Sequence, residues 1–236
     1  MRAMVLAAGR GSRLAPLTDE CPKPLLEVGG ITLLERTLRS LETAGFERIV
    51  LNVSWLGEQI RSAVRARPAG GAEVVISDEG ELRLETGGGI YRALSLLGRR
   101  PFAVVNSDVL TDFPMARLAD QIERWPATRL AHCVLVPNPP HNAGGDFSCD
   151  PDGHLHNEPR LTFSGLSVLH PLLFDSWVHG NVYPLAPLLR GAADEGRASA
   201  EVWHGYWNDV GTRKRLMEAR RVAGSTQLAH PAGPGD

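Results

Sequence analysis

Glycine, serine and two cations stand close together after an apolar N-terminal run. Gly9 and Gly11 lie in Gly9-Arg-Gly-Ser-Arg13, and Lys23 follows ten residues later between two prolines. Glycines allow a tight turn whose consecutive N–H groups contact phosphate oxygens. Arginine adds a two-pronged donor and lysine a point charge. The pattern predicts that Gly11, Ser12, Arg13 and Lys23 bind one triphosphate.

A Gly-x-Gly pair by itself is most often an ordinary strand-to-helix turn. Two common nucleotide motifs are also absent here, because Leu14 replaces the third glycine of the dinucleotide fingerprint and no GxxxxGK[ST] occurs. The phosphate-binding interpretation therefore depends on the arginine and the lysine that accompany the glycines.

A carboxylate and an amide end the apolar run Val104-Val-Asn-Ser-Asp108. Because successive strand residues alternate faces, Asn106 and Asp108 are expected on the same side of the strand. Open α/β sheets bind ligands at the carboxyl ends of their strands, where a carboxylate can hold a hard cation together with phosphate oxygens. Asp108 is thus a candidate Mg²⁺ ligand and Asn106 a candidate substrate ligand. The alternative is that Asp108 caps the next helix, although Asp112 is also available as a cap.

Three consecutive glycines follow Glu85-Thr86 and precede a helix-forming stretch. Backbone N–H and C=O groups of such a run can contact the edge of a nucleobase, and Gly88 is the candidate for that role. A flexible surface turn is the alternative interpretation of any glycine triplet.

Short apolar runs that could position these residues recur along the first half of the chain. Runs at 3–7, 48–53, 72–76 and 102–106 suit strands buried on both faces, with helical patterns at 32–44 and 56–67 between them. The alternation predicts an α/β fold with a parallel sheet covered by helices. Longer strands at 129–137 and 162–170 are expected to extend the sheet, with a Pro/Asn/Gly-rich excursion at 137–152 between them and helices at 182–190 and 213–222. We expect one domain over 1–223 and a flexible tail at 224–236.

The glycine loop with its lysine resembles the signature of the sugar-1-phosphate nucleotidyltransferase family, which includes glucose-1-phosphate thymidylyltransferases and mannose-1-phosphate guanylyltransferases. The resemblance runs from Met1 to about Ala223 and implies a single Rossmann-like domain with a mixed, mainly parallel sheet flanked by helices. In that family the loop and the arginine bind the triphosphate and the lysine contacts the α-phosphate. Tyr206-Trp-Asn-Asp-Val-Gly-Thr resembles the closing W-x-D-[VI]-G-T, whose aspartate is the second metal ligand. Asp209 would therefore join Asp108 on Mg²⁺, unless it is only a turn residue.

Three segments resemble one subgroup, the uridylyltransferases that act on N-acetylmuramate 1-phosphate. They are the run at 84–90, the excursion at 139–147 and the stretch at 157–165. The resemblance makes Asp146, Glu158 and Gly165 candidate ligands of the acceptor sugar. Pro159 stands where the glucose-1-phosphate branch has a lysine, so Arg160 and Arg213 are the remaining candidates for the acceptor phosphate.

The resemblance implies transfer of a uridylyl group from UTP to N-acetylmuramate 1-phosphate, with Mg²⁺ as cofactor, in the recycling of cell-wall sugar. Two alternatives stay open at this point. The chain could use another pair, such as GTP with mannose 1-phosphate, or it could be a regulatory subunit that binds nucleotide sugars without turnover.

Composition restricts the partners and the compartment. The net charge of −2 over 236 residues gives no basic face for nucleic acid. No apolar stretch approaches the roughly 20 residues that span a bilayer. The three cysteines form no CxxC pair, which suits a reducing compartment. We therefore expect a soluble cytoplasmic protein that binds neither nucleic acid nor membrane; the sequence says nothing about its oligomeric state.

Overall fold

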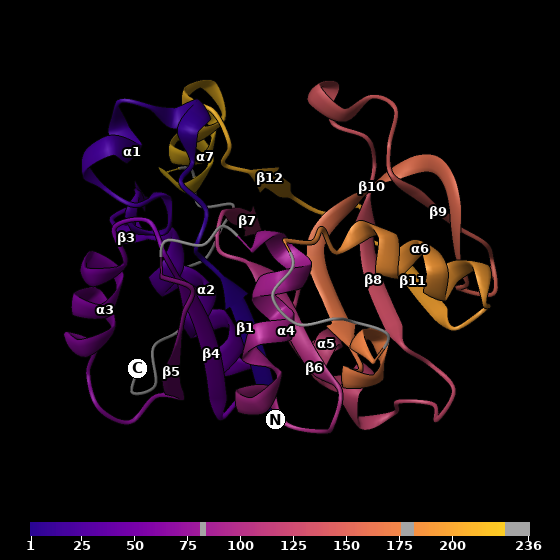
Figure 1. Cartoon of the computed structure of the whole chain (residues 1–236). Helices are drawn as coiled ribbons and strands as arrows, with labels where there is room; N and C mark the ends of the chain where they lie inside the picture. The colour runs from indigo at the N-terminus through magenta and orange to yellow at the C-terminus, as the bar shows by residue number, and fades with distance from the viewer. Residues whose placement is uncertain (81–83, 176–181, 225–236) are drawn as a thin grey trace.

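The computed structural model describes residues 1–80, 84–175 and 182–224, and its centre is an eight-stranded mixed sheet (Figure 1). The strand order is β11-β8-β10-β6-β1-β4-β5, with β9 paired to β10. Four strands form a parallel group: β1 (Arg2–Leu6), β4 (Arg48–Val53), β5 (Glu73–Asp78) and β6 (Phe102–Asn106). The remaining members are β8 (Ala131–Val136), β9 (Phe147–Cys149), β10 (Leu155–Leu169) and β11 (Ala198–Val202). The mixed, mainly parallel sheet confirms the predicted fold class.

Helices cover both faces of the sheet because its central strands are apolar on both faces. Ala3 and Val5 of β1 face one core and Met4 faces the other. The first core is closed by α2 (Leu33–Thr43), α3 (Gly57–Arg65) and α5 (Ala116–Glu123). The second is closed by α4 (Glu85–Leu97) and α6 (Ala186–Asp194). Burial on both sides explains why these strands read as continuous apolar runs.

A third, smaller core lies beyond the carboxyl ends of the parallel strands. The terminal helix α7 (Arg213–Gly224) packs there against the segment that follows β1 (Figure 1). That segment contains η1 (Ser12–Leu14), α1 (Leu17–Glu20), η2 (Lys23–Leu25), β2 (Glu27–Val28) and β3 (Ile31–Thr32). A two-stranded antiparallel pair, β7 (Val109–Thr111) with β12 (Trp207–Asp209), lies beside it. The third core thus joins the segment that follows β1 to helix α7 at the edge where the strands stop.

The second half of the chain differs in detail from the expectation. The excursion holds the short helix η3 (Pro140–Asn142) and β9, and it leads into a strand that begins at Leu155 rather than near 162. Another short helix, η4 (Pro171–Phe174), follows β10. The predicted helix at 182–190 starts only at Ala186, and most of the predicted tail lies outside the described residues. Among the described residues no helix is long and apolar enough to cross a membrane.

Candidate active site

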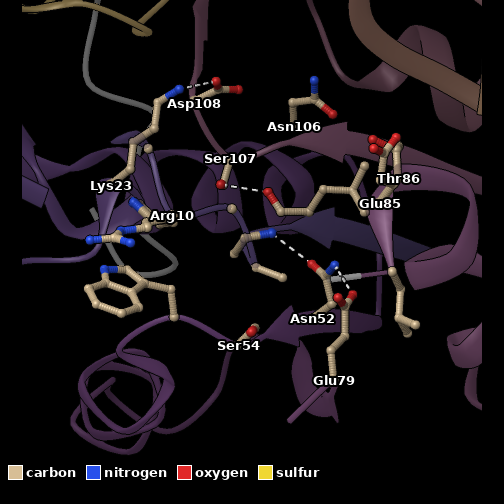
Figure 2. A pocket seen from close by; sticks show the side chains of 18 of the residues that line it. Arg10, Lys23, Asn52, Ser54, Glu79, Glu85, Thr86, Asn106, Ser107 and Asp108 are labelled. Atoms are coloured by element: carbon tan, nitrogen blue, oxygen red, sulfur yellow. Dashed lines mark hydrogen bonds and ion pairs between the residues drawn. The ribbon is translucent and has the colours of Figure 1, made fainter. Parts of the chain in front are cut away.

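A cavity of about 910 Å³ opens where the parallel strands end (Figure 2). Its wall takes residues from the carboxyl ends of β1, β4 and β6, which is where open α/β sheets place their ligands. Six of the predicted site residues share this wall: Gly11, Ser12, Arg13, Lys23, Asn106 and Asp108. The residues that sequence reasoning assigned to the triphosphate and one of the two predicted metal ligands, Asp108, therefore meet in one cavity, whereas Asp209 is not on its wall.

The loop between β1 and η1 requires glycine at position 11. Gly11 has φ of 66°, in the left-handed region that favours glycine. A Cβ there would lie 3.2 Å from both the Lys23 Cβ and the Thr18 Cγ2. The Thr18 hydroxyl donates a hydrogen bond of 2.9 Å to the Gly11 carbonyl, which holds the turn in place. The loop backbone is thereby held against the side chain of Lys23, so that loop and cation can contact the same ligand.

Lys23 and Asp108 form an ion pair across the cavity (Figure 2). Pro22 precedes the short helix η2 and Pro24 lies in its first turn, which restricts the backbone on both sides of the lysine. The side chains of Lys23 and Asp108 are 12% and 26% exposed, so the pair is shielded but reachable. Phosphate oxygens compete for such a lysine, and a divalent cation competes for such a carboxylate.

Asp209 reaches the neighbourhood of Asp108 through the β7–β12 pair. Asp209 lies opposite Val109 in the antiparallel register, and the Val210 N–H donates a 2.8 Å hydrogen bond to the Asp108 carbonyl. The Asp209 Oδ1 accepts a hydrogen bond from Arg215 Nη1 at 3.0 Å and lies 2.9 Å from His141 Nε2. Asp108, directly before β7, and Asp209, in β12, offer carboxylate oxygens, the ligands that Mg²⁺ takes in combination with substrate phosphates. The two predicted ligands therefore fit the metal.

A different acidic group lies far from this wall. Among the described residues, Asp150, Asp152 and His154 come within metal-ligand distance of one another, in the exposed turn between β9 and β10. Asp150 also pairs with His156, and this contact is the first cause that lowers the pKa of its carboxyl group. In this turn His154 and His156 both pair with Asp150.

Gly165 makes room for Asn106. Gly165 lies in β10, which is antiparallel to β6, and its φ of 81° coincides with a register shift of β10 between Phe163 and Ser167. A Cβ at this position would lie 2.6 Å from the Asn106 Nδ2. Asn106 lines the cavity, whereas Gly165 is behind it. The structure thus brings Asn106 and Gly165 together, with Asn106 on the wall, while the predicted contact of Gly165 with the acceptor sugar stays a prediction.

The glycine triplet packs helix α4 against its neighbours. A Cβ at Gly87 would lie 2.9 Å from the Tyr183 carbonyl, and one at Gly89 would lie 2.5 Å from the Glu79 Oε1. Gly88 is buried and donates its N–H to the Tyr183 carbonyl at 3.1 Å. Glu85 and Thr86, not Gly88, are on the cavity wall. The N–H group of Gly88 is consequently engaged within the protein, and the nucleobase contact remains a prediction without a place on this wall.

Asp146 and Glu158 lie outside the cavity wall. The Asp146 Oδ2 accepts hydrogen bonds from the Phe163 N–H at 2.9 Å and from Asn142 Nδ2 at 3.0 Å, which ties the excursion to β10. The Glu158 side chain is 66% exposed and pairs with Arg160 at 3.2 Å. The structure therefore does not place Asp146 and Glu158 on the wall that carries Asn106, and their contacts with the acceptor sugar stay predictions.

Asn52 and Glu79 were missed by sequence reasoning. Asn52, 4% exposed at the end of β4, accepts a 2.7 Å hydrogen bond from the Ala7 N–H and donates one of 2.7 Å to Glu79 Oε1 (Figure 2). Burial raises the pKa of the Glu79 carboxyl group, against the effect of that hydrogen bond. Both residues line the cavity. The available signal was a polar residue at the end of an apolar strand, the same signal that identified Asn106.

Comparisons with known proteins agree with this geometry. The MobA-like NTP transferase domain matches residues 3–200. The chain belongs to the MobA-like NTP transferases. The N-acetylmuramate alpha-1-phosphate uridylyltransferase of Neisseria meningitidis serogroup B is 47% identical to it over 229 residues, covering 95% of this chain and 99% of that protein. The protein of the same name from Caulobacter vibrioides is 34% identical over 92% of this chain and 94% of its own length.

Solved structures of this transferase fold superpose over nearly the whole chain. A putative glucose-1-phosphate thymidylyltransferase from Bacillus anthracis gives a TM-score of 0.80 at 14% identity and covers 98% of both chains. HddC from Yersinia pseudotuberculosis, complexed with GMP-PN, gives 0.75 at 21% identity and covers 93% of this chain and 98% of its own. At these identities the likeness establishes the fold, and the chain is a nucleotidyltransferase by its sequence relatives.

Proposed function

We propose that this nucleotidyltransferase transfers the uridylyl group of UTP to N-acetylmuramate 1-phosphate and releases pyrophosphate, in the cytoplasmic recycling of cell-wall sugar. The two uridylyltransferases named above support the substrates, because they match this chain over more than nine tenths of its length. The observation that carries the reaction type is the meeting of the glycine loop, Lys23 and Asp108 on one cavity wall.

The chemistry needs positioning more than proton transfer. An oxygen of the acceptor's phosphate, already anionic near neutral pH, attacks the α-phosphorus of UTP. The bond from that phosphorus to the oxygen bridging to the β-phosphate breaks, and pyrophosphate leaves with that oxygen. Lys23 would leave its pairing with Asp108 for the α-phosphate, while Arg13 and the N–H groups from Gly11 onward would hold the departing pyrophosphate. Fixed charges of this kind stabilise a phosphoryl-transfer transition state.

Asp108 and Asp209 are the residues that would hold Mg²⁺. Bound there, the ion would supply Lewis-acid polarisation of the α-phosphate oxygens. Each carboxylate also has a basic partner from the protein: Lys23 for Asp108, and Arg215 with His141 for Asp209. We expect the ion to replace Lys23 at Asp108, and the phosphates to replace Asp108 at Lys23.

We expect the acceptor to bind beside Asn106. Asn106 is the predicted substrate ligand on the wall, and the absence of a side chain at Gly165 leaves room for its amide. N-acetylmuramate carries a carboxylate in addition to its phosphate, so its pocket needs extra positive charge. His141 brings one basic side chain from the excursion next to Asp209. Arg213, an earlier candidate for the acceptor phosphate, is exposed and donates to the Ala15 carbonyl at 3.3 Å.

The main alternative is a guanylyltransferase that uses mannose 1-phosphate. A mannose-1-phosphate guanylyltransferase catalytic subunit beta from Danio rerio is 28% identical over 92% of this chain, which covers 63% of that protein. The test is a kinetic comparison of N-acetylmuramate, N-acetylglucosamine, glucose and mannose 1-phosphates, each with UTP, dTTP and GTP. The proposal predicts the highest kcat/KM for UTP with N-acetylmuramate 1-phosphate. A maximum for GTP with mannose 1-phosphate would replace the substrates and keep the nucleotidyl transfer, and no turnover with any pair would favour a regulatory subunit.

A further inference from the structure

Arg215 is a buried arginine with few partners. The residue is 9% exposed, in the first turn of α7, and its Nη1 pairs with the Asp209 Oδ1 at 3.0 Å. Its Nε and Nη2 are buried and have no hydrogen-bond partner among the described residues. A buried donor without a partner costs free energy, and more so when the group is charged. The other buried positions of α7 are mostly apolar: Leu216, Ala219 and Val222. An apolar side chain would therefore fill position 215 at lower cost, unless the guanidinium serves Asp209.

The Arg215 guanidinium occupies the space that the missing side chain of Gly211 leaves. A Cβ on Gly211 would lie 2.2 Å from the Arg215 Nη2 and 3.2 Å from the Arg13 Nη2. Gly211 itself lines the cavity. Arg215 thus packs directly behind a backbone segment of the site wall, and any side chain at position 211 would push it away from Asp209.

Both basic partners of Asp209 lie at the same oxygen. Arg215 donates a hydrogen bond to Oδ1 and the His141 Nε2 lies 2.9 Å from it, whereas no hydrogen bond or ion pair to Oδ2 is found in the part of the chain that the structure describes. The His141 side chain is 37% exposed, whereas that of Arg215 is 11% exposed. Arg215 is consequently the partner whose position is fixed by packing, and it leaves Oδ2 as the oxygen available to a cation.

We infer that Arg215 is a positioning residue, which fixes the Asp209 carboxylate through Oδ1 so that Oδ2 is presented to the divalent ion. The inference rests on the proposed function, in which Asp209 binds that ion. Partners that orient a metal-binding carboxylate typically contribute 10- to 100-fold in metal affinity. Arg215 contacts the ion and the substrates only through Asp209.

The test is a titration of the full-length enzyme with Mn²⁺ in the presence of UTP and without acceptor, with free Mn²⁺ measured by electron paramagnetic resonance. We expect Arg215→Met to weaken Mn²⁺ binding about 10-fold or more. Gly211→Ala should weaken it in the same direction, since the added Cβ displaces the guanidinium. Lys214→Met, an exposed neighbour on the same helix, is the matched control and should bind Mn²⁺ as the wild type does.

A double-mutant cycle distinguishes positioning from a general structural role. If Arg215 acts through Asp209, Arg215→Met should add no further weakening to Asp209→Asn. Full additivity, or wild-type Mn²⁺ binding by both Arg215→Met and Gly211→Ala, would overturn the inference. If Asp209→Asn itself bound Mn²⁺ as the wild type does, the proposed metal site would be wrong as well. A loss with Asp209→Asn alone would leave the metal site intact and remove only the role of Arg215. Thermal unfolding of each variant shows whether it is folded. If Arg215→Met does not fold, Gly211→Ala carries the test.

Discussion

Replacing Gly165 with alanine tests whether the Asn106 amide needs the space that this glycine leaves beside it. With φ of 81°, an alanine at position 165 adopts the left-handed region at a cost of about 1–2 kcal/mol. The new Cβ would lie 2.6 Å from the Asn106 Nδ2 and must reach at least 3.4 Å for ordinary contact, so the amide moves by about 0.8 Å. Overpacking of this kind costs about 1–3 kcal/mol. We expect a total loss of unfolding free energy of about 2–5 kcal/mol in urea denaturation.

The displaced amide should also reduce catalysis. A misplacement near 1 Å at a substrate-positioning residue can cost on the order of 10²-fold, so kcat/KM for the acceptor should fall about 10- to 100-fold. Gly153→Ala is the matched control, because Gly153 has φ of 83° and a Cβ there meets only the Ala200 carbonyl at 3.5 Å. It should lose about 1–2 kcal/mol and keep wild-type kinetics. Equal stability losses in the two variants, with unchanged kinetics for Gly165→Ala, would refute the reasoning.

Three further predictions concern separate parts of the molecule. Arg13→Ala should lower kcat/KM by on the order of 10²-fold with an unchanged melting temperature, and unchanged steady-state kinetics would remove its role at the pyrophosphate. Burial raises the pKa of Glu79 above its ordinary value of about 4.3. Its contribution to stability is therefore present below that ordinary pKa and is lost as pH rises through the raised one. Glu79→Gln avoids this loss, so urea denaturation across that window should increasingly favour the variant, and a pH-independent difference would contradict the cause. Asp146→Ala should cost about 1–3 kcal/mol, because the Phe163 N–H loses its acceptor, while Glu158→Ala should change stability by no more than about 0.5 kcal/mol. Equal effects of the last two in chemical denaturation would count against the tie between the excursion and β10.

The parallel half of the sheet could be predicted because local pattern and burial agree there. The runs at 48–53 and 102–106 are apolar at nearly every position, and both faces of these strands are covered by helices. The first half of β10 was missed because its pattern is exposed and polar: residues 156–160 include Glu158 and Pro159 and have no apolar face. The pairs that join this part of β10 to β9 lie at Leu155, His156 and Leu161, on either side of a register shift, so the sequence pattern of 157–160 carries no signal of the strand.

The phosphate end of the site could be predicted because its chemistry is local in sequence. The glycine loop, Arg13 and Lys23 lie within fifteen residues, so spacing alone brings them together. The rest depends on tertiary contacts. Asn52 meets Glu79 only because β4 and β5 are neighbours, and His141 meets Asp209 only because the excursion reaches β12. The nucleobase contact of Gly88 stays a prediction, because in sequence a glycine that allows close helix packing, as Gly87 and Gly89 do, looks like one that admits a ligand.

The central claim is that uridylyl transfer occurs in the cavity that Lys23 and Asp108 share. The most direct measurement follows UTP, pyrophosphate and the sugar nucleotide together by phosphorus NMR, with N-acetylmuramate 1-phosphate and Mg²⁺ present, for the wild type and for Asp108→Asn. The account predicts one UDP-sugar for each pyrophosphate released by the wild type, no pyrophosphate without acceptor, and nearly complete loss of both products in Asp108→Asn. Pyrophosphate release without a matching UDP-sugar, or wild-type turnover by Asp108→Asn, would contradict it.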